Sequence, residues 1–408
     1  MKTTSKITIV GAGISGLITA LELEQAGFSP TIIEASSGVG GRVKTDVVDG
    51  FQLDHGFQVL LEAYPKANQY LDYEELKLQK LVPGAVIFKN GRASTIGDPL
   101  RSSALLLPTL MANVGSIQDK WTIFKLNLEL KKKSIDAIFK DEQLSTLEYL
   151  KHKGFSDRII TQFFKPFFSG IFLETELDTS SVMFQFIYKM FGEGLAVVPK
   201  AGIQAIPNQL KSKLKNTTFK FDTKVKAVEG KRLILEDDAV IDSDIIVVAT
   251  EAQTLLGLNQ KTTWKSCDNL YFEVEKDTLK KPIIGLIADE NALINNIFYT
   301  TSVTTENTNA SPVLSVTVVK RHELNESELI HKVETELKAH CGITTKRFIK
   351  RYAIKKALPD LKTVQYTKPD YKFSDDIYVA GDTALNGSLN AAMSSGEAVA
   401  KAIIRRFK

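Results

Sequence analysis

Short apolar runs and helically spaced apolar positions alternate near the start of the chain. Residues 7–10 form a short strand pattern, and a segment of helical periodicity follows it. The apolar positions of that segment are Ile14, Leu17, Ile18 and Leu21. Gly27 is placed to end the helix, and Pro30 precedes a second strand pattern at 31–34. This order predicts a unit of strand, helix and strand.

The pattern changes several times further along the chain. A long helical stretch is expected at 104–191, and another helix passes through 210–214. Short strand patterns follow at 219–221, 224–228, 232–235 and 245–250. Strands dominate 270–319, a helix is expected near 326–340, and an apolar run from Ile377 leads into a final helix of small residues. The pattern is typical of an α/β protein.

Length and composition indicate an ordinary globular protein. The 408 residues suggest roughly two domains, with 43% hydrophobic and 25% charged residues. The net charge is only +4, and the longest block of one sign is 131–133. Charge therefore does not favour a nucleic-acid partner.

The cysteines and the hydropathy of the chain indicate the cellular compartment in which we expect the protein. Two cysteines, Cys267 and Cys341, favour a reducing compartment without a disulfide framework. The first motif begins within a dozen residues of Met1, which leaves no room for a signal peptide. No run approaches ~18 consecutive apolar residues. We therefore expect a cytoplasmic protein with at most peripheral membrane contact.

A glycine motif lies between the first strand and the first helix. It reads Gly11, Ala12, Gly13, Ile14, Ser15, Gly16. Gly11 permits a tight turn, Gly13 lets the backbone approach a pyrophosphate, and Gly16 lets helix and strand pack closely. Glu34 follows at about the distance of the acid that holds an adenosine ribose. The motif predicts a dinucleotide site; the alternative is such a unit with incidental glycines.

A second glycine segment makes the prediction more specific. Gly40 and Gly41 permit close approach to a pyrophosphate, and the guanidinium of Arg42 can pair with it. The segment from Glu34 and Ala35 to Arg42, E-A-x-x-x-x-G-G-R, resembles the fingerprint of the flavin amine oxidase superfamily. That superfamily includes amine oxidases, protoporphyrinogen oxidase, phytoene desaturases and carotenoid isomerases. The resemblance implies an extended FAD that reaches a second domain.

The resemblance also implies an interleaved architecture. We expect a Rossmann-type FAD-binding domain interleaved with a mixed α+β substrate domain. The FAD-binding domain would comprise residues 1–75, 195–255 and 350–408, and the substrate domain residues 76–194 and 256–349.

Further cofactor-binding residues are carried over by the resemblance. Val225 would bond adenine through its backbone, unless it is an ordinary core valine. Gly381 and Asp382 would meet the flavin ribityl chain, and the final helix, from Leu389 and Asn390, would direct its positive end at the flavin ring. The alternative for that helix is an amphipathic C-terminal helix capped by the turn at 386–388.

The sequence also contains candidates for catalytic residues and for residues near the flavin. Asp54 and His55 are the acid–base candidates, and the alternative is a polar turn with His55 merely hydrogen-bonded. In amine oxidases an aromatic residue usually stands where this chain has Ser388, which weakens the case for simple amine substrates. The cysteine that tethers flavin in some relatives has no match, so FAD should be noncovalent. Lys265 is a conceivable equivalent of a lysine near the flavin.

Two apolar regions admit more than one interpretation. The aromatic residues of 163–191 either line a chamber for a hydrophobic substrate or form plain core. The segment 105–133 either docks on a membrane or is a buried helix with a solvated lysine end, and we expect the latter. No metal site is expected, because His322, His331 and His340 are nine residues apart and cannot share a helix face.

These patterns together favour an FAD-dependent oxidoreductase that abstracts hydride from an activated C–H bond of a hydrophobic small molecule. Dioxygen or another electron acceptor would reoxidise the flavin. The alternatives are a redox-neutral, flavin-dependent isomerase of a polyene and a flavin-binding protein without catalysis.

Overall fold

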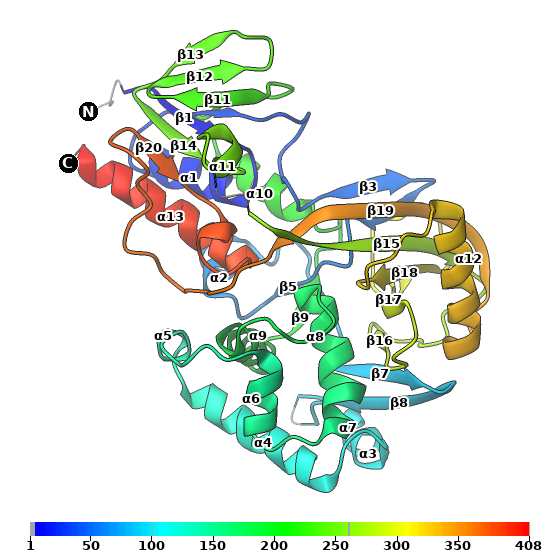
Figure 1. Cartoon of the computed structure of the whole chain (residues 1–408). Coiled ribbons are helices and arrows are strands. Elements are labelled where there is room, and N and C mark those ends of the chain that lie inside the picture. Colours follow the sequence, from blue (N-terminus) through cyan, green and yellow to red (C-terminus); the bar gives the residue numbers. More distant parts are fainter. Residues whose placement is uncertain (1–4, 100, 260–261, 408) are drawn as a thin grey trace.

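A computed structural model describes residues 5–99, 101–259 and 262–407. One layer is a parallel sheet in the order β10-β2-β1-β14-β20 (Figure 1). Its strands are β1 (Ile7–Val10), β2 (Thr31–Ile33), β10 (Thr218–Lys220), β14 (Ile245–Val248) and β20 (Ile377–Val379). The strand β14 is entirely apolar because both faces of the sheet are covered. The sheet joins the start, the middle and the end of the chain.

Helices cover one face of the parallel sheet and a small antiparallel sheet covers the other. The helices are α1 (Ile14–Gln25), α2 (Pro65–Tyr70), α10 (Ala205–Lys213) and α13 (Leu389–Arg406). The small sheet comprises β11 (Val225–Glu229), β12 (Arg232–Leu235) and β13 (Val240–Asp242), and α11 (Ala252–Leu255) adjoins it. Ile7 and Ile9 pack toward the helices, whereas Val10 packs toward the small sheet.

The first and the last helix are in direct contact. The Thr19 hydroxyl of α1 donates to the carbonyl oxygen of Gly396 in α13, at 3.1 Å. A Cβ at Gly396 would lie 2.4 Å from the carbonyl oxygen of Ser15, so the two helices approach at backbone distance. The glycine motif and the C-terminal segment are thereby brought together.

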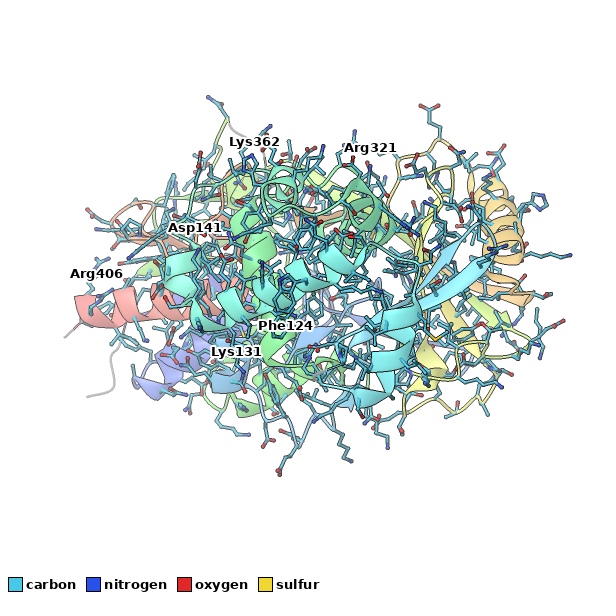
Figure 2. All side chains as sticks on the ribbon, turned by 90° about the horizontal axis from the view of Figure 1, so that it is seen from below. Phe124, Lys131, Asp141, Arg321, Lys362 and Arg406 are labelled. Atoms are coloured by element: carbon cyan, nitrogen blue, oxygen red, sulfur yellow. The ribbon has the colours of Figure 1, made fainter. Side chains whose placement is uncertain are left out.

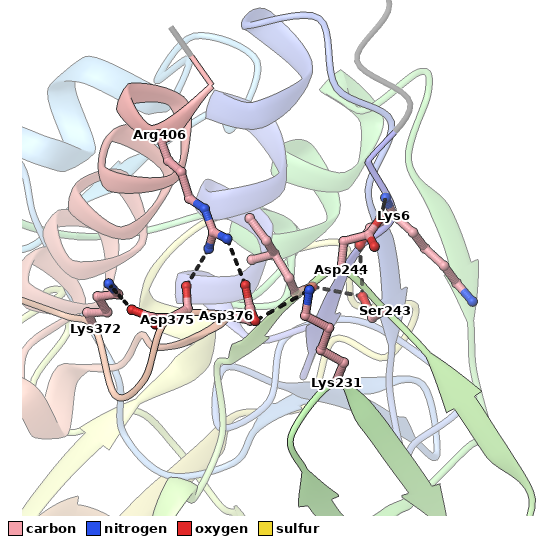
Figure 3. A network of polar contacts seen from close by, with 9 residues as sticks. Lys6, Lys231, Ser243, Asp244, Lys372, Asp375, Asp376 and Arg406 are labelled. Atoms are coloured by element: carbon pink, nitrogen blue, oxygen red, sulfur yellow. Dashed lines mark hydrogen bonds and ion pairs between the residues drawn. The ribbon is translucent and has the colours of Figure 1, made fainter.

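A polar network ties the same chain regions at the other end of the sheet (Figure 3). The backbone N–H of Lys6 donates to Asp244 Oδ2 at 2.8 Å, just before β1 and β14. Arg406 at the end of α13 donates to Asp376 Oδ1 at 2.8 Å, and Lys231 lies 3.4 Å from the same carboxylate. The network therefore joins the amino ends of β1, β14 and β20 to the end of α13.

A mixed sheet forms the second layer, at the right in Figure 1, in the order β19-β15-β18-β17-β16-β7-β8. Its strands are β7 (Gly84–Lys89), β8 (Arg92–Gly97), β15 (Trp264–Val274), β16 (Ile284–Ile287), β17 (Ile294–Tyr299), β18 (Val313–Val318) and β19 (Thr345–Pro359). The helices α12 (Glu326–Glu336) and η4 (Leu337–Cys341) pack on it through Leu329, Val333 and Leu337. Only the β7–β16 pair is parallel among the described strands of this sheet.

A helical layer lies at the bottom of Figure 1 and corresponds to the predicted stretch 104–191. It is a series of short helices: η1 (Ser103–Leu105), α3 (Leu106–Met111), α4 (Ile117–Lys132), α5 (Ile135–Ile138), α6 (Thr146–His152), α7 (Asp157–Ile159), η2 (Ile160–Phe164), α8 (Lys165–Phe172) and α9 (Ser181–Glu193). None of the helices in the described ranges has both the length and the hydropathy needed to span a bilayer.

Small elements connect these layers. They are the hairpin β3 (Thr45–Val48) and β4 (Phe51–Asp54), the sheet of β5 (Leu60–Leu61), β9 (Ala196–Val198) and β6 (Gln79–Lys80), and the turns η3 (Thr300–Ser302) and η5 (Asp382–Ala384). The predicted α/β class, with a parallel sheet and a mixed sheet, is confirmed. The division into two discontinuous domains stays a prediction.

Candidate functional site

A cavity of about 830 Å³ extends from the parallel sheet to the helical layer. Its wall contains most of the residues predicted to bind a cofactor, together with His55. These are Gly11, Gly13, Ile14, Ser15, Glu34, Gly40, Gly41, Arg42, Gly381, Asp382 and Leu389. Gly16, Ala35, Val225 and Asn390 are not part of the wall. The two ends of the chain thus meet at one hollow.

The glycine turn presents unpaired backbone groups to this cavity. Gly11 has φ +107° and donates its N–H to the carbonyl oxygen of Ile33 at 2.8 Å. A Cβ at Gly16 would lie 2.0 Å from the carbonyl oxygen of Gly11, so α1 packs tightly on the turn. No side chain caps α1 and no acidic residue lies in its first turn. The first-turn N–H groups, at Ile14 and Ser15 on the wall, are therefore suited to an anion.

Glu34 is held rigidly at the end of β2. Its Oε2 accepts from the N–H of Ala12 at 2.7 Å, and its Oε1 accepts from the N–H and the hydroxyl of Ser36, at 2.9 and 2.7 Å. The N–H of Gly40 donates to the carbonyl oxygen of Ala12 at 3.0 Å. Glu34, the acid predicted to bind the ribose, and the second glycine segment are thereby fixed against the same turn.

Arg42 and Asp382 form an ion pair across 340 residues of sequence. Arg42 also donates to the carbonyl oxygen of Ala357 at 3.1 Å, and its guanidinium lies 5.3 Å from the ring centroid of Trp264. The Asp382 side chain is 7% exposed, whereas that of Arg42 is 41% exposed. Arg42 therefore neutralises a buried carboxylate while part of its guanidinium stays open to the cavity.

The final helix begins at the cavity. Ser388 is its N-cap, and the Ser388 hydroxyl accepts from the N–H of Ala391 at 3.0 Å. Ser388, Leu389 and Ala392 line the wall. Asn390 instead faces α2, where its Oδ1 accepts from the N–H of Lys66 at 3.0 Å. The capping turn that we weighed as an alternative is present, and it lies at the cavity edge.

Four of the predicted residues lie outside the cavity wall, and one of them, Asn390, faces α2. Ala35 is exposed beside Glu34, and Gly16 acts through packing. Val225 begins β11 and is buried at 7% exposure among the apolar residues on the other face of the parallel sheet. Its side chain behaves as a core valine, and its predicted backbone contact with adenine stays a prediction.

The two acid–base candidates point to different environments. His55 lies on the wall, with Nε2 3.0 Å from Asp46 Oδ2 and its ring 4.4 Å from that of Tyr352. Partial burial raises the pKa of Asp46, but contacts from His55 and Tyr352 outweigh it and hold this pKa below its usual value.

Asp54 is not on the wall. Its Oδ1 accepts from the Thr45 hydroxyl at 2.5 Å and from the N–H of Ile203 at 3.0 Å. Burial raises the pKa of Asp54 to about 6, although these two hydrogen bonds oppose the shift. Asp54 therefore links β3 to the loop before α10 and does not face a substrate.

Lys265, which the resemblance offered as the equivalent of a lysine near the flavin, lies at the cavity with partners that the sequence did not identify. Lys265 lines the wall, and its ammonium pairs with Glu174 and donates to the Thr179 hydroxyl at 2.9 Å. The Lys265 and Glu174 side chains are only 16% and 11% exposed. No motif surrounds Glu174 or Thr179, so only the folded arrangement identifies them as partners of Lys265.

The part of the cavity beside the helical layer is aromatic. Its lining residues are Phe163, Phe167, Phe168, Phe172, Tyr188 and Phe191. Phe164, Phe184 and Phe186 are fully buried and pack as core behind them. Part of the set thus lines the cavity and part is core, and binding of a hydrophobic substrate by the lining part stays a prediction. The described residues contain no group of three or more side chains that could hold a metal.

The site residues fit a bound dinucleotide: uncapped first-turn N–H groups, a fixed carboxylate and a partly free guanidinium lie along one wall. Comparison with known proteins agrees. Residues 14–404 match the model of the flavin containing amine oxidoreductases. The chain belongs to this family, as its sequence motifs predict.

Relatives and solved structures resemble different parts of the chain. Protoporphyrinogen oxidase 2 of Arabidopsis thaliana is 27% identical over 165 residues, 40% of this chain and 32% of that protein. A phytoene desaturase of Cercospora nicotianae is 31% identical over 110 residues, 24% of this chain and 18% of that protein. The matched segments thus span about a third or less of these relatives. The crystal structure of a CLA-producing fatty acid isomerase from P. acnes has the same fold, with TM-score 0.72 and 16% identity over 99% of both chains.

Proposed function

We propose that this protein oxidises an apolar small molecule by removing hydride from an activated C–H bond. The observation that carries the proposal is a single cavity that joins the cofactor-binding residues to a chamber of aromatic side chains. When bound, FAD supplies the two-electron redox chemistry that no side chain of the protein possesses.

The protein's own residues have separable roles in this proposal. The first turn of α1 and Arg42 hold the pyrophosphate, and Glu34 holds the adenosine ribose. Asp382 accepts a hydrogen bond from a cofactor hydroxyl and keeps Arg42 oriented. The aromatic chamber binds the apolar substrate and excludes water.

His55 is the proposed base. It stands on the cavity wall, and its Nε2 lies 3.0 Å from Asp46 Oδ2, which orients the imidazole. A neutral His55 would take the proton that leaves the substrate as hydride departs. Lys265, held by Glu174, places a positive charge on the cavity wall.

Some relatives are named for apolar compounds and others for amino acids or an amine, and the aromatic chamber favours the first group. Those reported above are named for protoporphyrinogen, phytoene and a fatty acid, which are all largely apolar compounds. The similar segments of the first two are short and the fatty acid isomerase is only 16% identical, so the substrate itself is proposed only by class. Dioxygen or another acceptor would complete the cycle, and the cytoplasmic location and noncovalent FAD stay predictions.

A second candidate is redox-neutral isomerisation of a polyene or a polyunsaturated chain. It is favoured by the whole-chain likeness to a fatty acid isomerase and by the same apolar chamber. The third alternative is a flavin-binding protein without catalysis, and anaerobic flavin bleaching distinguishes it from the two enzymes.

Anaerobic flavin bleaching tests these proposals. The purified holoprotein is mixed without oxygen with amines, porphyrinogens, polyenes and unsaturated fatty acids, and flavin absorbance is followed. Bleaching by an apolar compound supports the oxidase proposal, and turnover only with prereduced flavin supports the isomerase. No reaction with any compound in either redox state supports the non-catalytic alternative.

The role of His55 needs matched variants. We expect His55→Ala to slow flavin reduction by roughly a hundredfold while FAD affinity is unchanged. His331→Ala is the control, because His331 is exposed on α12 outside the cavity wall. Full reduction rates in His55→Ala would exclude the proposed base.

A further inference from the structure

Exposed apolar side chains gather on α3 and α4. Eight of the thirteen large exposed hydrophobic residues in the described ranges belong to these two neighbouring helices. They are Leu106, Leu107, Leu110, Met111, Ile117, Trp121, Phe124 and Leu128, exposed by 37% to 86%, and we name them the α3–α4 patch. The expectation of a buried helix in this segment is therefore wrong. A concentration of apolar surface of this kind indicates an interaction site.

The patch is one continuous surface. The ammonium of Lys120 in α4 donates to the carbonyl oxygen of Leu110 in α3 at 2.9 Å, so the two helices adjoin. The rings of Trp121 and Phe124 stack with centroids 5.4 Å apart. The opposite side of α4 is anchored by the buried residues Leu126 and Leu130. The helix therefore has one apolar side for the core and another that faces outward.

The surface around the patch is cationic. Residues 101–133 contain six basic and two acidic residues. Arg101 pairs with Asp98 and Lys133 with Asp141, which leaves Lys125, Lys131 and Lys132 as the exposed cations. Asp119 is 1% exposed and Glu129 pairs with Lys153 at 2.7 Å, so neither carboxylate balances these three lysines. The ammonium of Lys125 lies 5.7 Å from the Trp121 ring. Figure 2 views this face, with Phe124 and Lys131 both labelled on it.

The patch adjoins the wall of the cavity. Ile123 and Asn127 of α4 line the hollow, as do Pro99 and Arg101 just before α3. The helix that carries Trp121, Phe124 and Leu128 outward thus forms part of the wall on its inner side. A molecule that leaves an apolar phase at the patch would meet the aromatic chamber across a single helix.

We propose that the α3–α4 patch docks on an anionic lipid membrane, with its apolar side chains in the interface and the lysines on the head groups. Apolar side chains flanked by lysines are the composition that binds anionic bilayers without spanning them. The docking itself is independent of the proposed reaction. The supply of a lipid-dissolved substrate through this face rests on the proposed function.

Vesicle flotation of the holoprotein tests the docking. We expect it to float with vesicles of equal parts phosphatidylcholine and phosphatidylglycerol, and much less with phosphatidylcholine alone. Leu107→Ser with Met111→Ser should weaken binding roughly tenfold, whereas Val240→Ser, an equally exposed apolar residue elsewhere, should have no effect.

Reversing the charge of exposed lysines tests vesicle binding a second time, with substitutions that should not disturb the fold. Lys131→Glu with Lys132→Glu should weaken binding to the anionic vesicles by roughly tenfold or more, because each lysine near such a surface contributes about 1 kcal/mol. Lys338→Glu, an exposed lysine beyond α12, should leave binding unchanged. Equal losses in the patch and control variants would overturn the proposal.

Trp121 reports insertion directly. Brominated lipids should quench the tryptophan fluorescence of the wild type, and Trp121→Phe should float equally well without that quenching. Absence of flotation on anionic vesicles overturns the proposal. So does a lipid-free dimer, measured by sedimentation, that the Leu107→Ser and Met111→Ser variant converts to monomer. Flavin bleaching by a detergent-dissolved substrate should be unchanged in the patch variants, which separates failure of docking from failure of the proposed function.

Discussion

Replacing Gly16 by alanine tests whether tight packing of α1 shapes the predicted anion site. A Cβ at this position would lie 2.0 Å from the carbonyl oxygen of Gly11, about 1.4 Å short of ordinary contact at 3.4 Å. The obstructing atom belongs to the backbone of the turn, so no side-chain rotation relieves the overlap. Either α1 or the turn must move.

Two effects of opposite sign determine how Gly16→Ala changes the free energy of unfolding. Alanine is favoured over glycine inside a helix by about 0.5–1 kcal/mol. Overpacking of this kind costs about 1–3 kcal/mol, and the backbone contact places it toward the upper end. We therefore expect Gly16→Ala to lower the free energy of unfolding by about 2 kcal/mol. The displaced first turn of α1 should also bind FAD more weakly.

Gly192→Ala is the matched control. Gly192 lies in α9, and a Cβ there would have no heavy atom within 4 Å, so helix propensity acts alone. This variant should be neutral or more stable by up to about 1 kcal/mol. Urea unfolding of the FAD-free protein and FAD titration provide the two measurements. If Gly16→Ala matches Gly192→Ala in stability and binds FAD as the wild type does, the packing argument is refuted.

Three further variants test separate parts of the structure. Arg42→Lys removes the planar guanidinium that pairs with Asp382, and equilibrium titration should show FAD affinity roughly tenfold lower; unchanged affinity would contradict the assigned role. Burial raises the pKa of Asp54 from 3.8 to about 6, so the folded state retains this proton longer than the unfolded state and loses stability as pH rises between these values. Asp54→Asn should therefore remove that pH dependence and stabilise the protein by up to about 3 kcal/mol above pH 6 in urea unfolding; an unaltered pH profile would show that Asp54 is not its source. Arg406→Ala breaks an exposed pair with Asp376 and should lower the free energy of unfolding by at most about 1 kcal/mol, and by less at high salt. A larger loss of stability would show that this network is stronger than surface ion pairs usually are.

The acid–base pair illustrates the limit of local prediction. Asp54 and His55 are adjacent in sequence, and both side chains can transfer protons. Successive residues at the end of a strand point to opposite sides, so only His55 reaches the cavity while Asp54 links β3 to the loop before α10. Their position beside a predicted cofactor segment identified both, and the chemistry of the imidazole favoured His55, but the sequence did not show that Asp54 points away from the cavity.

Long-range partners were equally unpredictable. The sequence assigned Arg42 to a pyrophosphate and Asp382 to a ribityl chain, and gave no sign that these side chains pair with each other. Glu174 and Thr179, which hold Lys265, lie in no motif. Such pairs depend on how elements far apart in the chain approach, and no local pattern records that.

The sequence by itself determined the class of this protein, because its cofactor motifs are backbone requirements. A turn that needs Gly11, a helix that must start without a capping side chain, and an acid after the next strand are constraints on local geometry. Neighbouring residues encode local geometry, which can therefore be predicted from the sequence without knowledge of the fold.

Only the tertiary structure decided what the apolar side chains do. Periodicity identifies the outward residues of α3 and α4 as hydrophobic, as it does for the buried phenylalanines of α8 and α9. Whether such a face becomes core, cavity wall or open surface depends on which distant segment packs against it. Burial is a property of two surfaces in contact, and the sequence of one helix specifies only one of them.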